Sequence, residues 1–373
     1  MRKTARIVAV ATTVALSFGL AACGDRDDDS NAAKDAVKSR RTDGVVPSAP
    51  APSTTASPID FKACMVSDSG GFDDKSFNQT ALKGQDDAKV LLGVQTTQVE
   101  SVGDSEYAGN LAKLIKAGCK EITTVGFKLG DATLASAKKH KKIDYAIVDF
   151  AYSDPKTGKN TAPPNVKGLV FDTKSASYLA GYLAAAKSES GKVGTFGGLP
   201  IPTVTDFMDG FLQGIEAYNK DEGADVQLLG WDGKDGQFTE DFEDTAKGQQ
   251  IGEQLVQQGA DIIFPVAGPA GLGGLQAAQD ADVRAIWVDT DGCVSAAEYC
   301  DVLLTSVMKA MDTAVTEAIK ASVDGKLNNE LYVGTLENNG VGLAPLAGDV
   351  DDELAGKIDE LRKGLIDGSI KLK

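Results

Sequence analysis

The chain has 373 residues, of which 42% are hydrophobic and 25% are charged, and its formal net charge is −16 at pH 7. This length and composition are typical of a globular protein with two lobes, each large enough for its own core. The acidic balance argues against nucleic acid as a partner, because nucleic acids are bound by basic patches.

Residues 1–22 have the features of a signal peptide for secretion. A basic start is followed by an apolar run from Ile7 to Leu20, which is too short for a membrane-spanning helix. The sequence LAAC that ends at Cys23 resembles a bacterial lipobox, which implies that Cys23 becomes the acylated mature N-terminus. We therefore expect export and attachment to the outer face of the cell membrane through lipid on Cys23.

Residues 23–58 are rich in Asp, Ser, Ala, Thr and Pro, and they show no apolar period. This composition predicts a disordered tether. Its ~35 residues would have a root-mean-square reach of roughly 30 Å. Such a reach would lift the folded part off the membrane and let it reorient.

From Ile59 onward, predicted strands alternate with predicted helices, which indicates parallel sheets. In the first half we expect strands near 61–67, 94–99, 122–125, 145–149 and 166–171, and helices near 74–92, 105–117 and 132–139. A helix over 173–188 is expected to cross between the lobes. The second half repeats the pattern, with strands near 192–196, 226–229, 261–266, 285–289 and 302–306, and helices near 205–220, 239–258 and 311–323, plus one that follows the glycine-rich turn 268–271.

Two similar α/β halves with chain crossings between them predict two doubly wound parallel-sheet lobes joined by a hinge. We expect the N-terminal lobe to comprise residues 59–172 and about 302–330. The C-terminal lobe is expected over 173–301 and about 331–345, and a helical tail over 346–373.

The stretch MVSDSGGFDDKSFNQT, residues 65–80, combines a strand end, a glycine-bearing turn and a helix start. Asp73 is a suitable N-cap residue, and Asp74 adds negative charge at the positive end of the helix dipole. Ligands of open α/β sheets bind outside the carboxyl ends of the strands, so Phe77 and Asn78 are expected to face that crevice. These side chains suit a flat ligand that forms hydrogen bonds, such as a nucleobase. Periodicity alone equally allows Phe77 to be a core residue.

The segment DSGGFDDKSFNQ, residues 68–79, resembles the signature near the mature N-terminus of the basic membrane lipoprotein (BMP, PnrA-like) family. The members of this family are substrate-binding lipoproteins of nucleoside ABC transporters, with a type I periplasmic-binding-protein fold. The resemblance continues, more loosely, from about residue 60 to about residue 345. It implies a monomer that needs no cofactor and passes a nucleoside to a transporter permease.

The resemblance also implies roles for single residues. Phe77 and Phe207 match two aromatic rings, one from each lobe, that sandwich the base in similar proteins, and such stacking is worth ~1–3 kcal/mol per base. Asp68 and Asn78 would bind the edge of the base. The ribose and backbone contacts of similar proteins are matched by Asp149, Asp289, Lys309 and Gly268.

Each of these roles has a structural alternative. Phe207 could pack in the core beside Phe211, Asp149 and Asp289 could cap strand ends at the surface, and Lys309 could lie solvated at a helix start. The chain also departs from the family near residues 291–293, where the usual glutamine is absent. Trp287, which replaces a smaller residue in many relatives, is expected to narrow the pocket wall.

Four cysteines remain besides Cys23, and an even number in an exported chain suggests disulfides. Cys293 and Cys300 would close a short loop, whereas Cys64 and Cys119 stand at the starts of two predicted neighbouring strands. We prefer the pairs Cys64–Cys119 and Cys293–Cys300, with four buried thiols as the alternative.

We find no catalytic residues and no metal ligands in the sequence. The only histidine, His140, lies in the lysine-rich run 138–142, so a Ser-His-Asp mechanism has no base. Residues 71–74 are similar to the end of the calcium motif of nucleoside hydrolases. However, Ser67 and Ser69 stand where that motif has aspartates, so much of the ligand set for calcium is missing.

We therefore predict a lipid-anchored receptor, not an enzyme, that closes on a nucleoside, with purine nucleosides as the first expectation. The nearest alternative is a receptor of the same fold for a sugar or another small polar ligand. A calcium-dependent nucleoside hydrolase is a remote alternative. A surface adhesin or signalling lipoprotein with a vestigial pocket is a further one.

Overall fold

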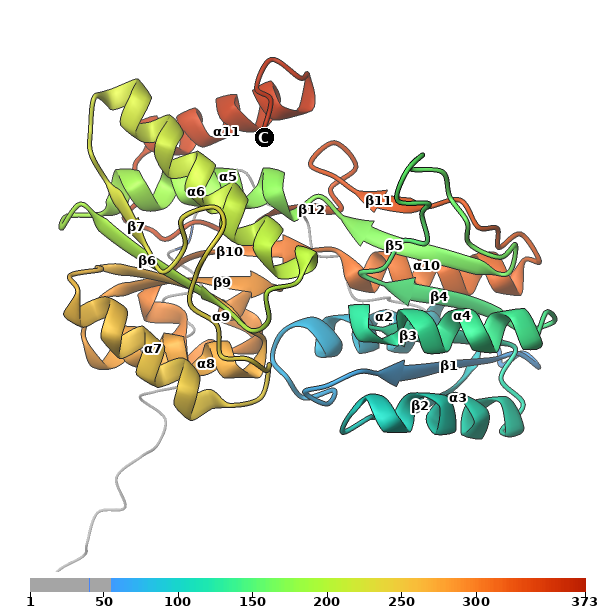
Figure 1. The fold of residues 1–373 in the computed structure, drawn as a ribbon. Coiled ribbons are helices and arrows are strands. Elements are labelled where there is room, and N and C mark those ends of the chain that lie inside the picture. The colour runs from blue at the N-terminus through green and yellow to red at the C-terminus, as the bar shows by residue number, and fades with distance from the viewer. Residues whose placement is uncertain (1–39, 41–54) are drawn as a thin grey trace, which may run out of the picture.

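The computed structural model describes Arg40 and residues 55–373, so the predicted signal peptide, Cys23 and most of the predicted tether lie outside the described residues. The described chain forms two α/β lobes that lie side by side (Figure 1). Each lobe contains one six-stranded sheet, with strand orders β11-β5-β4-β3-β1-β2 and β12-β10-β9-β8-β6-β7. The strands run parallel except for β12, which pairs antiparallel with β10. The predicted class of two doubly wound α/β lobes is confirmed.

The first sheet has helices on both faces. Its strands are β1 (Lys62–Ser67), β2 (Gln95–Val99), β3 (Glu121–Val125), β4 (Asp144–Val148), β5 (Val166–Phe171) and β11 (Tyr332–Gly334). One face packs against α2 (Phe77–Leu92) and α10 (Met311–Val323), and the other against α3 (Tyr107–Lys116) and α4 (Gly130–Lys139). Strand β1 contributes to both cores, because Ala63 and Met65 face one side and Cys64 and Val66 the other.

The second sheet is covered in the same way. Its strands are β6 (Lys192–Gly197), β7 (Gln227–Leu229), β8 (Ile262–Val266), β9 (Arg284–Asp289), β10 (Leu303–Lys309) and β12 (Val341–Leu343). The helices are α5 (Thr173–Lys187), α6 (Pro202–Glu222) and α11 (Asp352–Ile366) on one face, and α7 (Thr245–Gln257), α8 (Pro269–Asp280) and α9 (Gly292–Ser295) on the other. The short helices η1 (Asp104–Glu106), η2 (Phe127–Leu129) and η3 (Ala297–Val302) lie in connections. Within the described part, no helix has the length and apolar character needed to cross a membrane.

The chain passes between the lobes after β5, after β10 and after β11. Two expected boundaries need correction. Strand β10 pairs with β9 and β12, so it belongs to the second lobe, although 302–330 was expected in the first. Strand β11 pairs with β5 in the first lobe, although 331–345 was expected in the second. The strands β11 and β12 have three residues each, which is too short for a periodic pattern to assign them.

The ordered part of the chain begins earlier than expected. The backbone N–H of Ala56 donates to Val90 O at 2.8 Å, and that of Ile59 to Gly93 O at 2.9 Å. These bonds attach residues of the predicted tether to the end of α2. The predicted boundary at residue 58 is therefore too late by a few residues.

The four remaining cysteines form two disulfide bonds. Cys64 of β1 is bonded to Cys119, which precedes β3, with their Cα atoms 5.9 Å apart. Cys293 of α9 is bonded to Cys300 of η3, with a Cα separation of 4.6 Å. These are the two pairs preferred from the sequence.

Candidate functional site

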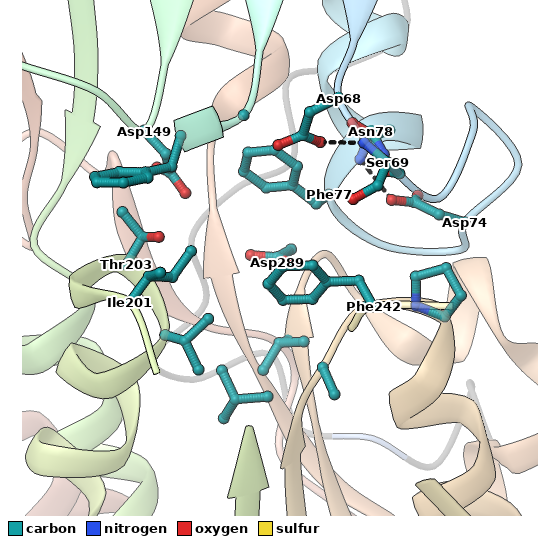
Figure 2. A pocket seen from close by; sticks show the side chains of 18 of the residues that line it. Asp68, Ser69, Asp74, Phe77, Asn78, Asp149, Ile201, Thr203, Phe242 and Asp289 are labelled. Carbon is teal, nitrogen blue, oxygen red and sulfur yellow. Dashed lines mark hydrogen bonds between the residues drawn. The ribbon is translucent and has the colours of Figure 1, made fainter. Parts of the chain in front are cut away.

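A cavity lies between the lobes at the carboxyl ends of strands from both sheets (Figure 2). It leaves about 80 Å³ for the centres of water-sized molecules, several times the ~10–15 Å³ that one water needs. All eight residues predicted to bind the ligand line it, namely Asp68, Phe77, Asn78, Asp149, Phe207, Gly268, Asp289 and Lys309. The structure thus brings together residues that span 242 positions of sequence, because parallel strands present their carboxyl ends at one edge.

The loop between β1 and α2 positions the first wall of the cavity. Helix α2 begins at Phe77, and Asp74 rather than Asp73 satisfies its first N–H groups. The Asp74 carboxylate accepts hydrogen bonds of 3.0, 2.7 and 3.0 Å from the backbone N–H groups of Ser76, Asn78 and Gln79. Burial raises the pKa of Asp74 to about 6, although these three bonds act in the opposite direction. The expected capping role of Asp73 is wrong, because the Asp73 side chain is exposed and pairs with Lys75.

Asp68 and Asn78 both line the cavity. The Asn78 amide donates to Ser69 O at 2.8 Å, and this bond fixes the orientation of the amide. Its Oδ1 is buried without a hydrogen-bond partner among the described residues, and such an unpaired buried acceptor costs ~1–3 kcal/mol. Asp68 Oδ1 accepts from the Ser69 N–H at 2.7 Å. Burial, which is the largest effect, raises the pKa of Asp68 to about 7.

Two carboxylates and one ammonium form the buried centre of the site. Lys309 Nζ lies 2.6 Å from Asp149 Oδ2 and 3.5 Å from Asp289 Oδ1. Burial by itself lowers the pKa of Lys309, but the two carboxylates more than offset it, so its pKa is raised. Burial raises the pKa of Asp149, and the Lys309 ammonium opposes this shift. Buried ion pairs add little net stability, which favours a functional role for this cluster.

The two aspartates are placed alike in the two lobes. Asp149 directly follows β4, and Asp289 ends β9. Both have positive φ angles, +61° and +69°, which are uncommon outside glycine. Strained backbone of this kind is concentrated at functional sites. This backbone conformation, shared by both aspartates, directs one carboxylate from each lobe toward the same lysine.

Aromatic rings from both lobes flank that lysine. The ammonium of Lys309 lies 4.6 Å from the ring centroid of Phe77 and 5.7 Å from that of Phe207. A third ring, Phe171, is 5.5 Å away. These are cation–π distances. Phe207 also belongs to the hydrophobic core of the second lobe, where it packs near Phe264, so its core and cavity roles are both present.

Several cavity residues were not predicted from the sequence. Phe242 reaches the cavity from the irregular segment before α7 (Figure 2), although the sequence predicted that the helix begins near residue 239. Phe127 follows the end of β3, and the strand-end argument used for Asp149 could have found it. The remaining unpredicted lining residues are Ser69, Asp74, Gly126, Lys128, Ile201, Thr203, Val204, Val266, Ala267, Pro269 and Val288.

The expectation for Trp287 is wrong. Its side chain is fully buried on the face of β9 that packs against α8 and α9, and it is not among the lining residues. Its indole N–H instead donates to Lys75 O of the first lobe at 3.2 Å. Trp287 therefore connects the lobes without narrowing the cavity.

Comparison with known proteins identifies the family. The sequence profile described as "ABC transporter substrate-binding protein PnrA-like" (Bmp) matches residues 61–372. The chain belongs to this family. The resemblance inferred from residues 68–79 is thereby confirmed. Substrate-binding proteins of ABC transporters carry a small-molecule ligand to a permease, so the chain has both as partners.

Named relatives agree with this assignment. The chain is 30% identical, over 100% of its length and 99% of the relative's, to the "CD4+ T-cell-stimulating antigen" of Listeria innocua. It is 29% identical to the "ABC transporter nucleoside-binding protein BmpA" of Lactococcus lactis, over 83% of this chain and 88% of that one. A solved ABC transporter solute-binding protein from Aeropyrum pernix superposes with a TM-score of 0.73 at 24% identity, over 83% of this chain and 92% of that one. This structural likeness confirms the predicted periplasmic-binding-protein fold.

Proposed function

We propose that this substrate-binding protein captures a nucleoside between its lobes, as a monomer, and delivers it to the permease of an ABC importer. The observation that carries the proposal is that Phe77 and Phe207, from opposite lobes, flank one centre that also holds Asp149 and Asp289. Rings suit the faces of a base, and carboxylates suit the hydroxyl groups of a ribose. The name of the Lactococcus lactis relative, a nucleoside-binding protein, supports the same ligand class.

The ribose would bind at the carboxylates. An ionised carboxylate offers about four acceptor positions, and the bonds to Lys309 and Ser76 occupy only part of this capacity. Two adjacent hydroxyl groups can therefore donate to Asp149 and Asp289. The rings of Phe77 and Phe207 would then stack on the base.

The base edge would meet Asp68 and Asn78. The Asp68 carboxylate can accept from the base edge. One amide N–H of Asn78 is bonded to Ser69 O, and its Oδ1 has no partner among the described residues. A base edge with N–H donors, as in guanosine or inosine, fits this pair better than one that presents a ring acceptor, as in adenosine. We therefore propose a purine nucleoside of the first kind as the ligand.

The charge of the cavity favours a neutral ligand. Asp68, Asp74, Asp149 and Asp289 line it, against the two cations Lys128 and Lys309. A phosphate group would meet this excess of acidic side chains at short range. The proposal therefore covers nucleosides and not nucleotides.

Isothermal titration tests the ligand class. The panel contains guanosine, inosine, adenosine, uridine, guanosine monophosphate, ribose and a hexose. We expect the purine nucleosides to bind and the free sugars and the nucleotide to bind weakly or not at all. Binding of sugars alone would retire the nucleoside proposal and leave the sugar-receptor alternative. Catalysis is tested in the same samples, because release of free base from inosine with added calcium would indicate a hydrolase.

We further propose that lipid on Cys23 holds the protein at the outer face of the cell membrane. The LAAC sequence that ends at Cys23 carries this proposal. Cell fractionation of the Cys23→Ser variant tests it. The variant is expected to remain unacylated and uncleaved, and a variant that is processed and membrane-bound like the unaltered protein would contradict the lipid attachment.

A further inference from the structure

Three neighbouring strands of the first sheet, β1, β3 and β4, end side by side at the cavity. The residues that directly follow them are Asp68, Gly126 and Asp149. The backbone N–H of Asp68 donates to Val125 O at 3.0 Å. That of Gly126 donates to Val148 O at 3.3 Å. Gly126 therefore stands between the two carboxyl groups that the first lobe presents to the cavity (Figure 2).

The carboxyl group of Asp68 occupies the space that a side chain at position 126 would need. A Cβ atom added to Gly126 would lie 1.9 Å from Asp68 Oδ2, 2.2 Å from its Cγ and 2.6 Å from its Oδ1. Non-bonded carbon atoms are best separated by ~3.5–4.0 Å. The Asp68 carboxyl group and any side chain at position 126 therefore exclude each other.

The Asp68 side chain is held in this position. Its Oδ1 accepts from the Ser69 N–H at 2.7 Å, and the residue is buried. An aspartate carboxyl group can move only by rotation about two torsion angles, which have few favourable values. A side chain at position 126 would force such a rotation, and the oxygens of Asp68 would then face the cavity differently.

We propose that Gly126 is a positioning residue for ligand recognition. The absence of a side chain at Gly126 admits the Asp68 carboxyl group to the cavity wall, and this placement sets the preference for a base that presents N–H donors. The preference rests on the proposed nucleoside function, whereas the positioning of Asp68 does not.

The backbone at Gly126 favours glycine for a second reason. Its φ of +117° and ψ of 147° lie in a region that residues with a side chain rarely adopt. A substitution there strains the backbone in addition to displacing Asp68. The two effects differ in one respect, because only the displacement depends on the side chain at position 68.

A double-mutant cycle in the unliganded chain separates the two effects. Gly126→Ala is introduced into the unaltered protein and into the Asp68→Ala variant, and urea unfolding gives the midpoint of each. We expect Gly126→Ala to lower the midpoint much less in the Asp68→Ala background, because the backbone strain is common to both backgrounds and the steric conflict is present in only one. Equal shifts in the two backgrounds, or loss of folding in both, would overturn the proposal.

Gly118→Ala is the matched control. Gly118 also has a positive φ, +82°, but a Cβ atom there would have no atom of the described chain within 4 Å, its own sequence neighbours aside. This substitution should lower the midpoint equally with Asp68 and with alanine at position 68. A dependence on Asp68 as large as that of Gly126→Ala would mean that the cycle reports the stability of the lobe, and the proposal would fail.

Calorimetric titration of Gly126→Ala with guanosine and adenosine tests the recognition step. The measurement is made at pH 8, above the pKa of Asp68, which burial raises to about 7. Loss of a hydrogen bond to an ionised carboxylate should lower guanosine affinity by about 10- to 150-fold. The affinity for adenosine, which presents a ring acceptor, should fall less. Equal losses for the two nucleosides would show that Gly126 does not act through Asp68.

The two experiments also distinguish this inference from the proposed function. If the unaltered chain binds no nucleoside, the proposed function fails, and the urea cycle still decides whether Gly126 positions Asp68. If nucleosides bind and the cycle shows no coupling, the role of Gly126 fails and the proposed function stands.

Discussion

Ser76 Oγ donates a hydrogen bond of 2.8 Å to Asp289 Oδ2, and this bond joins the first lobe to the second. The same loop makes two further bonds across the gap, from the Gly70 N–H to Glu243 Oε1 at 2.9 Å and from the Trp287 indole to Lys75 O at 3.2 Å. Asp289 also lies 3.5 Å from Lys309. One carboxylate therefore takes part both in closing the lobes and in lining the cavity, which gives a direct physical link between ligand binding and closure.

The contact of Trp287 with Lys75 provides a test of closure away from the cavity. Trp287→Phe removes the donor across the lobes but keeps an aromatic ring in the core. Loss of ~0.5–1.5 kcal/mol from the closed form is expected to weaken nucleoside affinity by about 2- to 10-fold. Titration calorimetry measures the affinity, and small-angle scattering should show a more extended unliganded protein.

Trp231→Phe is the matched control for that variant. The Trp231 indole donates to Asp209 within the second lobe at 3.0 Å, so its loss should leave affinity and overall dimensions unchanged. Equal effects of the two substitutions would mean that Trp287 acts through the stability of its own lobe.

Removal of Phe77 tests the placement of the base. Phe77→Ala deletes one stacking surface worth ~1–3 kcal/mol, so nucleoside affinity should fall by about 5- to 150-fold. Asp289→Ala, which removes a proposed ribose acceptor, should have an effect of at least similar size. Melting curves check that both variants fold. Unchanged affinity in both would place the binding site outside this cavity.

The pKa of Asp68 predicts a dependence of ligand choice on pH. Burial raises this pKa to about 7, so above pH 7 the carboxylate accepts N–H groups and below pH 7 it becomes a donor itself. Guanosine affinity should fall as the pH drops from 8 to 5.5, by up to about tenfold per pH unit. The affinity for adenosine, which presents a ring acceptor, should fall less over the same pH range. Asp68→Asn should abolish most of this difference in pH dependence between guanosine and adenosine. An unchanged pH profile in that variant would assign the effect to another group.

The order of strands and helices made much of this site predictable. Asp149, Asp289 and Lys309 each stand at a strand end, and parallel strands bring such ends to one edge. Phe77 and Asn78 begin the helix that follows the first strand after the loop of residues 68–76. Strand-helix alternation and the motif at 68–79 therefore account for most of the eight residues, whereas Phe207, inside helix α6, was reached only through the family resemblance.

The remaining features depend on contacts that no local pattern encodes. The choice of Asp74 over Asp73 as the cap follows from which carboxylate the loop buries. Phe242 comes from an irregular segment, and Trp287 faces α8 rather than the cavity. The unpaired oxygen of Asn78 appears only when its amide is seen to bond Ser69. Each of these outcomes is decided by tertiary packing.

A buried carboxyl far from the cavity gives the last prediction. Glu121 begins β3 and is fully buried, and its Oε1 accepts from Thr123 Oγ1 at 2.7 Å. Its Oε2 has no hydrogen-bond partner among the described residues. Burial raises the pKa of Glu121 to about 8 from an ordinary value of 4.5. The folded protein therefore binds one more proton than the unfolded chain between these two pH values.

This extra proton sets the sign of the pH effect. The contribution of Glu121 to stability is complete below pH 4.5 and is lost as the pH rises through 8. Glu121→Gln carries no such charge, so the variant should gain stability relative to the unaltered protein by up to about 1.4 kcal/mol per pH unit, and the gain should level off above pH 8. Melting temperatures of both proteins between pH 5 and 9 measure this difference, with the exposed Glu216→Gln as control. Parallel curves for the Glu121→Gln variant and the unaltered protein would show that Glu121 does not titrate in this range.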